Sequence, residues 1–241
     1  MLLKEGAFAM DYTLSYLLVL LAIGFSLWAS HKVNGTFEKY SRERPRSGMT
    51  GYDAARRVLD ANGLQAVRIE QIPGELTDHF DPRDNVIRLS ASVYGVASTA
   101  AVGVAAHEAG HAIQYAESYA PLKVRNAIVP ITNIGSRLSM PLIILGLIFS
   151  GAGHIWTTLA YVGVACFSLC VIFQLVTLPT EFNASRRAMV AIETSGMLTQ
   201  EELYSSEKVL SAAAMTYVAA LAVSVTQLLR LLSLVQRSDR R

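Results

Sequence analysis

Four long apolar stretches divide this chain, and they constrain its fold more than any other feature. They are residues 12–29, 138–151, 155–178 and 209–235. The third has no charged side chain and would span about 36 Å as a helix, enough to cross a bilayer. The second is short, and we expect it to extend a helix that begins near Ala127. The fourth contains Arg230 near its end, which would have to snorkel toward the membrane surface.

The short link between the second and third stretches, residues 152–154, predicts a transmembrane hairpin. The first stretch reads as a retained anchor rather than a signal peptide, because Lys4, Glu5 and Asp11 precede it without a clean positive region. These features predict a mainly α-helical, multi-pass integral protein of the cell membrane, with about four transmembrane helices and the lipid bilayer as a partner.

Composition supports a membrane protein and argues against other classes. The 241 residues are 52% hydrophobic and 17% charged, against about 25% charged in a typical soluble domain. The net charge of +2 gives no argument for binding nucleic acid. Cys166 and Cys170 lie inside an apolar stretch and read as small hydrophobic residues rather than as a disulfide.

A polar segment of roughly a hundred residues follows the first stretch and predicts a small α+β unit. Thr50 and Asp53 are spaced as a capping box that opens a helix, and Asn62-Gly63 closes it. Residues 67–72 and 85–90 alternate between apolar and polar side chains as strands do, with turn signals between them. We expect these strands to form a hairpin-like pair ahead of the next helix.

That next helix carries the motif His107-Glu108-Ala109-Gly110-His111. Side chains four residues apart lie on one helical face, so both imidazoles can bind one Zn²⁺ while Glu108 takes a proton from water. An exposed His/Glu pair on an ordinary helix is the alternative. The residues around the motif are almost all apolar or small, and there such polar groups would be costly to bury without a partner. Ala109 and Gly110 would let another element approach closely. The motif therefore predicts a hydrolytic zinc site.

A third protein ligand is usual in catalytic zinc sites. Because the hairpin crosses the membrane twice, the segment after Pro179 returns to the side of His111. Glu181 would then lie just beyond the third apolar stretch, in a short helix predicted from Thr180 to Ser195. The alternative is that Glu181 only stabilises the start of that helix through its dipole. The competing glutamates, farther from the membrane, are Glu193, Glu201 and Glu202; the last two belong to a capping box at Thr199 that opens the final helix.

Three segments resemble the YugP-type family of membrane-bound neutral zinc metallopeptidases, which is similar in layout to the HtpX-like membrane proteases. They are LTDHFDPRDNVIRLS at residues 76–90, HEAGHAIQ at 107–114 and EFNASRRA at 181–188. The resemblance implies a zincin-like catalytic unit at the membrane surface. It also implies a zinc ligand at the glutamate that opens a Glu-x-x-x-Asp motif, here Glu181. Ser185 replaces the aspartate of that motif, a departure that affects the support of the ligands, since hydrogen bonds behind a metal site orient its ligands.

His79 is a secondary candidate, on a loop ahead of a strand. It could donate a hydrogen bond to the oxyanion that forms when water attacks a peptide carbonyl. Alternatively, Asp78 or Asp81 holds its ring for structural reasons. His31 and His154 should not touch the zinc. Arg186 and Arg187 could bind substrate or lipid phosphate, although a solvated helix face is the commoner explanation.

Lysine and arginine residues near the span ends predict the orientation. The catalytic side carries Lys32, Lys39, Arg42, Arg44, Arg46, Lys123, Arg125, Arg186, Arg187 and Lys208, and the other side carries Lys4, Arg237, Arg240 and Arg241. This balance puts the active site in the cytoplasm and both termini outside. The basic tail would lie in the less positive compartment, and a re-entrant or interfacial last helix would resolve that conflict.

These inferences predict five regions: an N-terminal transmembrane anchor (1–30), a cytoplasmic α+β unit with the motif helix (31–126), a transmembrane hairpin (127–178), a third-ligand helix and loop (179–208), and a C-terminal membrane helix with a basic tail (209–241). The predicted function is zinc-dependent endopeptidase activity on polypeptides, membrane proteins among them, in protein quality control. The strand at 85–90 is a candidate edge for an extended substrate. The alternative is a non-catalytic zinc-stabilised scaffold or adaptor, whose site would be closed by a fourth ligand and would not need Glu108.

Overall fold

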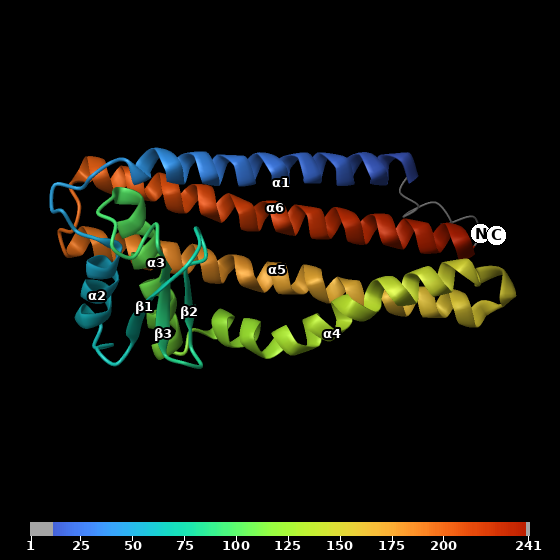
Figure 1. Ribbon diagram of the computed structural model, residues 1–241. Coiled ribbons are helices and arrows are strands. Elements are labelled where there is room, and N and C mark those ends of the chain that lie inside the picture. The colour runs from blue at the N-terminus through green and yellow to red at the C-terminus, as the bar shows by residue number, and fades with distance from the viewer. Residues whose placement is uncertain (1–11, 240–241) are drawn as a thin grey trace, which may run out of the picture. The chain divides into compact units, whose positions relative to one another are not determined.

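The computed structural model describes residues 12–239 and is mainly helical (Figure 1). Its elements in chain order are α1 (Tyr12–Ser41), α2 (Gly51–Ala61), β1 (Arg68–Ile72), β2 (His79–Asp81), β3 (Val86–Ser90), α3 (Thr99–Ala116), α4 (Ala120–Ile148), a short 3₁₀ helix η1 (Ser150–Ala152), α5 (His154–Thr194) and α6 (Gln200–Asp239). The described chain divides into two compact units, residues 12–28, 124–176 and 217–239, and residues 29–123 and 177–216. Lys4, Glu5, Asp11, Arg240 and Arg241, which entered the predictions on the anchor and the orientation, lie outside the described residues.

Within residues 12–239, four helices, α1, α4, α5 and α6, are long and apolar enough to cross a membrane by length and composition. They coincide with the four apolar stretches of the sequence. α1, α5 and α6 extend beyond the predicted spans; α1, for example, runs to Ser41 without a break at residue 30. α4 begins well before its predicted span but ends at Ile148, short of residue 151. The predicted region boundaries at residues 30 and 126 therefore fall inside continuous helices.

In the first unit, α4 and α5 pack as the hairpin that the short link predicted. A Cβ atom added at Gly146 of α4 would lie 2.6 Å from the carbonyl oxygen of Trp156, and one added at Gly163 of α5 would lie 2.8 Å from that of Ser139. Only glycine permits backbones to come this close, which is how helices commonly associate in membranes. Arg230 of α6 places its guanidinium 4.6 Å from the ring centre of Tyr16, so its charge faces an aromatic ring within this unit.

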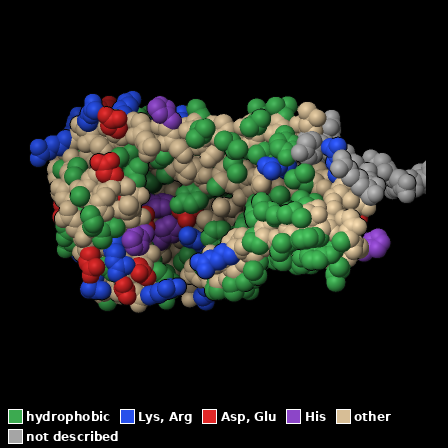
Figure 2. All heavy atoms as spheres, turned by 45° about the vertical axis from the view of Figure 1, so that its right-hand side comes forward, with side chains coloured by type: hydrophobic (Ala, Val, Ile, Leu, Met, Phe, Trp, Pro, Cys, Tyr) green, Lys and Arg blue, Asp and Glu red, His purple; other side chains and the backbone are tan. Residues whose placement is uncertain are grey.

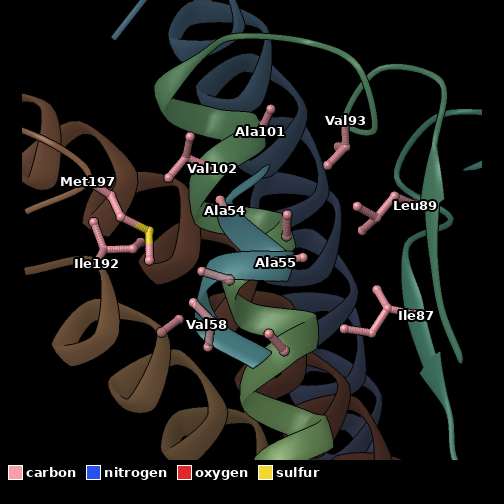
Figure 3. Close-up of a cluster of buried hydrophobic side chains, with 14 of the residues drawn as sticks. Ala54, Ala55, Val58, Ile87, Leu89, Val93, Ala101, Val102, Ile192 and Met197 are labelled. Carbon is pink, nitrogen blue, oxygen red and sulfur yellow. The ribbon is translucent and has the colours of Figure 1, made fainter. Parts of the chain in front are cut away.

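The second unit has a core of small and branched side chains between α2, α3, the sheet and the ends of α5 and α6 (Figure 3). Ala54 and Val58 of α2 pack with Val102 of α3 and with Ile192 and Met197. The alanine-rich faces allow the helices to lie close together, so that polar groups on α3 and α5 can meet.

Local signals at the helix ends are confirmed. Thr50 and Asp53 form both hydrogen bonds of a capping box at the start of α2, and Asn62 caps its end. At the start of α6, the Glu202 carboxylate accepts a hydrogen bond from the backbone N–H of Thr199 at 2.8 Å. Such pairings satisfy backbone groups that the first turn of a helix leaves without partners.

The predicted strand hairpin is wrong. The sheet order is β1-β3-β2, with β1 parallel to β3 and β2 antiparallel to β3. β3 is therefore the central strand, not the edge that the sequence suggested for a substrate. Its adjacent apolar residues Val86 and Ile87 are both fully buried, as expected of a strand covered on two faces. Alternation predicted β1 and β3 correctly, but it carries no information about the order or the direction in which strands pair.

The predicted helix start at Thr180 is also wrong, because α5 continues through it from His154 to Thr194 with Pro179 inside. Proline removes one backbone donor and usually kinks or ends a helix, but long apolar helices tolerate it where their packing continues on both sides. The helix ends one residue before the predicted Ser195, near Gly196, whose φ of +58° suits glycine.

Candidate metal centre

The site begins on α3, which presents His107 and His111 on one face. Their rings meet edge to face with centroids 4.7 Å apart. The helix opens with Ser98, whose hydroxyl accepts a hydrogen bond from the backbone N–H of Ala101. Most of α3 is buried, and both ligand-type side chains lie at its half-buried face.

Close contact between α3 and α5 brings Glu181, a third side chain able to bind a metal, to these histidines. A Cβ atom added at Gly110 would lie 2.7 Å from the carbonyl oxygen of Ala184. The absence of that Cβ lets the α5 backbone lie against α3, as the small residues of the motif predicted. Glu181 is 3% exposed and lies one turn before this contact.

His107, His111 and Glu181 converge on one point. The Nε2 atoms of both histidines lie 3.4 Å from the same carboxylate oxygen, Oε2 of Glu181. Two atoms bound at about 2.0–2.1 Å to one tetrahedral zinc ion would lie roughly 3.4 Å apart. The three donor atoms all lie within 4.8 Å of one another, so this group could hold a metal ion, and its nitrogen and oxygen donors suit zinc. Figure 2 shows histidine side chains gathered on the drawn face with an acidic side chain beside them.

The electrostatics of the site favour a cation. Burial lowers the pKa of His111, but the hydrogen bond with Glu181 and the charges of Glu108 and Glu181 together raise it by more than burial lowers it. The pKa of His111 therefore lies above its ordinary value. Glu108 is only 8% exposed. Among the described residues, its carboxylate has no hydrogen bond or ion pair, and its charge is one of the causes that raise the pKa of His111.

Each histidine has a polar partner behind it. Ser185 Oγ lies 3.1 Å from His107 Nδ1, so the hydroxyl stands where the resemblance suggested an aspartate. Gln114 Oε1 lies 3.0 Å from His111 Nδ1. Gln114 was not among the residues predicted for the site, although its position three residues after His111 puts the two side chains on one helical face.

His79 is the first residue of β2 rather than part of a loop, and it does not belong to the His107–His111–Glu181 group. The Thr77 carbonyl holds its ring, 2.8 Å from Nδ1. The two aspartates considered as its partners bond elsewhere, Asp78 to Ser90 and Asp81 to Arg88. Because a carbonyl only accepts hydrogen bonds, Nδ1 carries the proton, and Nε2 of the neutral ring cannot donate one to an oxyanion.

The remaining candidates lie away from this group. Glu193 is exposed, and Glu202 accepts hydrogen bonds from the backbone N–H groups of Arg46 and Thr199. Arg186 is exposed, whereas Arg187 pairs with Glu117 at 2.7 Å. Of the glutamates considered as the third ligand, Glu181 alone joins the two histidines in a described metal-ligand group.

Comparison with known proteins gives a consistent picture. A family model described as "Putative neutral zinc metallopeptidase" matches residues 15–236. A curated relative from Bacillus subtilis (strain 168), named "Putative membrane protease YugP", is 48% identical over 213 residues, which cover 88% of this chain and 92% of the relative. No solved structure matches the chain.

Proposed function

The chain belongs to the neutral zinc metallopeptidase family and is a multi-pass membrane protein, and from this premise we propose that it is a membrane-embedded endopeptidase. One observation carries the proposal. Two imidazole nitrogens of α3 and a carboxylate oxygen of α5 converge with spacings that suit a single zinc ion.

We assign the roles as follows. His107 Nε2, His111 Nε2 and Glu181 Oε2 hold the ion. When bound, zinc supplies a Lewis acid that polarises the scissile carbonyl and makes water more acidic. Glu108 accepts a proton from the water as the water oxygen adds to the carbonyl carbon. Glu108 then gives that proton to the departing amine as the C–N bond breaks, so no covalent intermediate with the protein forms.

An enzyme accounts for the site better than a scaffold does. A structural zinc site is usually closed by four protein ligands, whereas a catalytic one keeps a position open. The metal-ligand group found among residues 12–239 has three members. In addition, a scaffold would have no use for Glu108, a buried carboxylate without a hydrogen bond in the described chain.

The outer strand β2 is the better candidate for binding an extended substrate, now that β3 is known to be central. β2 contacts α3, the helix that carries both histidines. A polypeptide could add its own strand along the unpaired side of β2. We further propose that the active site faces the cytoplasm, as the distribution of lysine and arginine predicts, and that membrane proteins are among the substrates in protein quality control.

Glu108→Gln tests the mechanism. The variant should keep about one zinc per chain and lose proteolysis, because an amide cannot accept the proton of water. Glu193→Gln, on the exposed face of α5, is the matched control and should cleave like the parent. Equal cleavage by Glu108→Gln and the parent would contradict the assigned base. If the variant is inactive, it can trap substrates in native membranes for identification by mass spectrometry.

A further inference from the structure

Behind His111, a run of hydrogen bonds leads through Gln114 to α5. Gln114 lies on α3 and is 0% exposed. Its Oε1 faces His111 Nδ1 at 3.0 Å. Its Nε2 lies 2.8 Å from the carbonyl oxygen of Thr180 and 2.9 Å from Oδ1 of Asn183. A buried amide with all of these partners is held in one orientation, because rotating it would leave several polar groups without partners.

The direction of these bonds follows from groups that can play only one role. The Thr180 carbonyl can only accept, so the atom of Gln114 that faces it must be the amide nitrogen. The atom facing His111 is then the amide oxygen, which can only accept. His111 Nδ1 must therefore carry the proton, and Nε2 of the neutral ring keeps its lone pair. Nε2 is the atom that faces Glu181 in the metal-ligand group.

Arg187 fixes the other end of the run. A guanidinium only donates, so the atom of Asn183 that lies 2.8 Å from Arg187 Nε must be its oxygen. That same oxygen accepts from Gln114 Nε2. Arg187 is held in turn by Glu117, the residue that caps the end of α3, at 2.7 Å. These hydrogen bonds therefore join the end of α3 to α5, and their donors and acceptors cannot easily exchange roles.

We propose that Gln114, held by Asn183 and Arg187, is a positioning residue that fixes His111 in its Nδ1–H tautomer and so presents Nε2 to the metal. This inference deepens the proposed function and rests on it for the identity of the metal. His107 differs, because the Ser185 hydroxyl can either donate or accept and so does not impose a tautomer. The tautomer of His111 is therefore fixed before zinc binds, whereas that of His107 is not.

Zinc affinity, measured by competition with a chelator on the full-length protein, provides the first test. Gln114→Leu should weaken binding by about 10- to 100-fold, the usual effect of removing a partner behind a ligand. Asn183→Asp keeps an acceptor for both Gln114 and Arg187 and should bind zinc like the parent, whereas Asn183→Leu should bind more weakly. Arg186→Ala, an exposed neighbour outside the run, is the control. The Asn183 pair keeps the test decisive even if Gln114→Leu does not fold.

The second readout does not depend on activity or on the metal. The metal-free protein is labelled with ¹⁵N-histidine and its NMR spectrum is recorded at a pH where the rings are neutral. The ring signal of His111 is identified as the one that His111→Ala lacks, and it should be that of an Nδ1–H ring. The same state is expected in Asn183→Asp, and Gln114→Leu should lose it. An Nε2–H ring at His111 in the parent, or unchanged zinc affinity in both Gln114→Leu and Asn183→Leu, would overturn the proposal. If the parent binds zinc and has this tautomer but cleaves no peptide, the proposed function fails while the positioning role stands.

Discussion

The α4–α5 pair in one unit and the α3–α5 contact in the other are both made by glycines against a neighbouring backbone. A Cβ at Gly146 would lie 2.6 Å from the Trp156 carbonyl oxygen, and a Cβ at Gly110 would lie 2.7 Å from that of Ala184. Around Gly146 the packed side chains are apolar, such as Ile143 and Ala160. Close backbone packing at Gly146 therefore only holds helices together, whereas around Gly110 polar groups line the approaching faces and meet as a candidate metal site.

The third ligand should give the largest effect in this comparison. Glu181→Ala removes one of three donors, so zinc affinity should fall by more than the roughly 10- to 100-fold typical of losing a supporting hydrogen bond. Glu193→Ala, twelve residues along the same helix on an exposed face, should bind zinc normally. Zinc content after dialysis measures both. If the two variants behaved in reverse, the assignment of Glu181 would fail, although the roles of His107 and His111 would remain.

Substituting alanine for Gly110 and for Gly146 distinguishes a contact that positions the metal ligands from one that only stabilises the fold. Gly110→Ala should push α5 away from α3 and weaken zinc binding about tenfold or more, because Glu181 would no longer reach both histidines. Gly146→Ala creates a similar overlap and should lower stability by about 1–3 kcal/mol, but the zinc affinity of the folded protein should not change. Thermal inactivation in detergent and chelator competition measure the two effects. Equal zinc affinities for both variants would show that the α3–α5 approach does not position the site.

The smallest effect is expected at the exposed end of the network behind His111. The hydrogen bond from Arg187 lowers the pKa of Glu117, so this carboxylate stabilises the fold while it is charged. The contribution is present above the ordinary glutamate range and disappears as pH falls through the lowered pKa. Because Glu117 is 55% exposed, Glu117→Gln should lower the unfolding midpoint by at most about 2 °C at neutral pH. The difference from the parent should vanish in acid; a difference that persisted there would point to another cause.

Much of the site could be predicted because its signals are local. The spacing of His107 and His111 fixes their common helical face, and the apolar stretches identify the four candidate spans. The number of predicted crossings between His111 and Glu181 then narrowed the search for a third ligand to one segment, and Glu181 of that segment lies beside both histidines. These inferences needed only helix periodicity and the length of a bilayer.

The features that could not be predicted depend on tertiary packing. Alternation at residues 67–72 and 85–90 identified strands, but β2 has only three residues and no pattern that would insert it next to β3. The sequence reads Pro179 as a helix end, whereas the continuous packing of α5 carries the helix through it. Gln114 acquires its role only from partners on α5, more than sixty positions away in the chain.

Anomalous diffraction at the zinc edge, from crystals of the zinc-loaded protein, would locate the ion relative to the three proposed ligands. We expect one strong peak within about 2.0–2.2 Å of His107 Nε2, His111 Nε2 and a Glu181 carboxylate oxygen, with a non-protein atom as the fourth ligand. A peak closed by a fourth protein side chain would support the scaffold instead. A zinc ion bound away from these three residues would show that they are not the metal ligands.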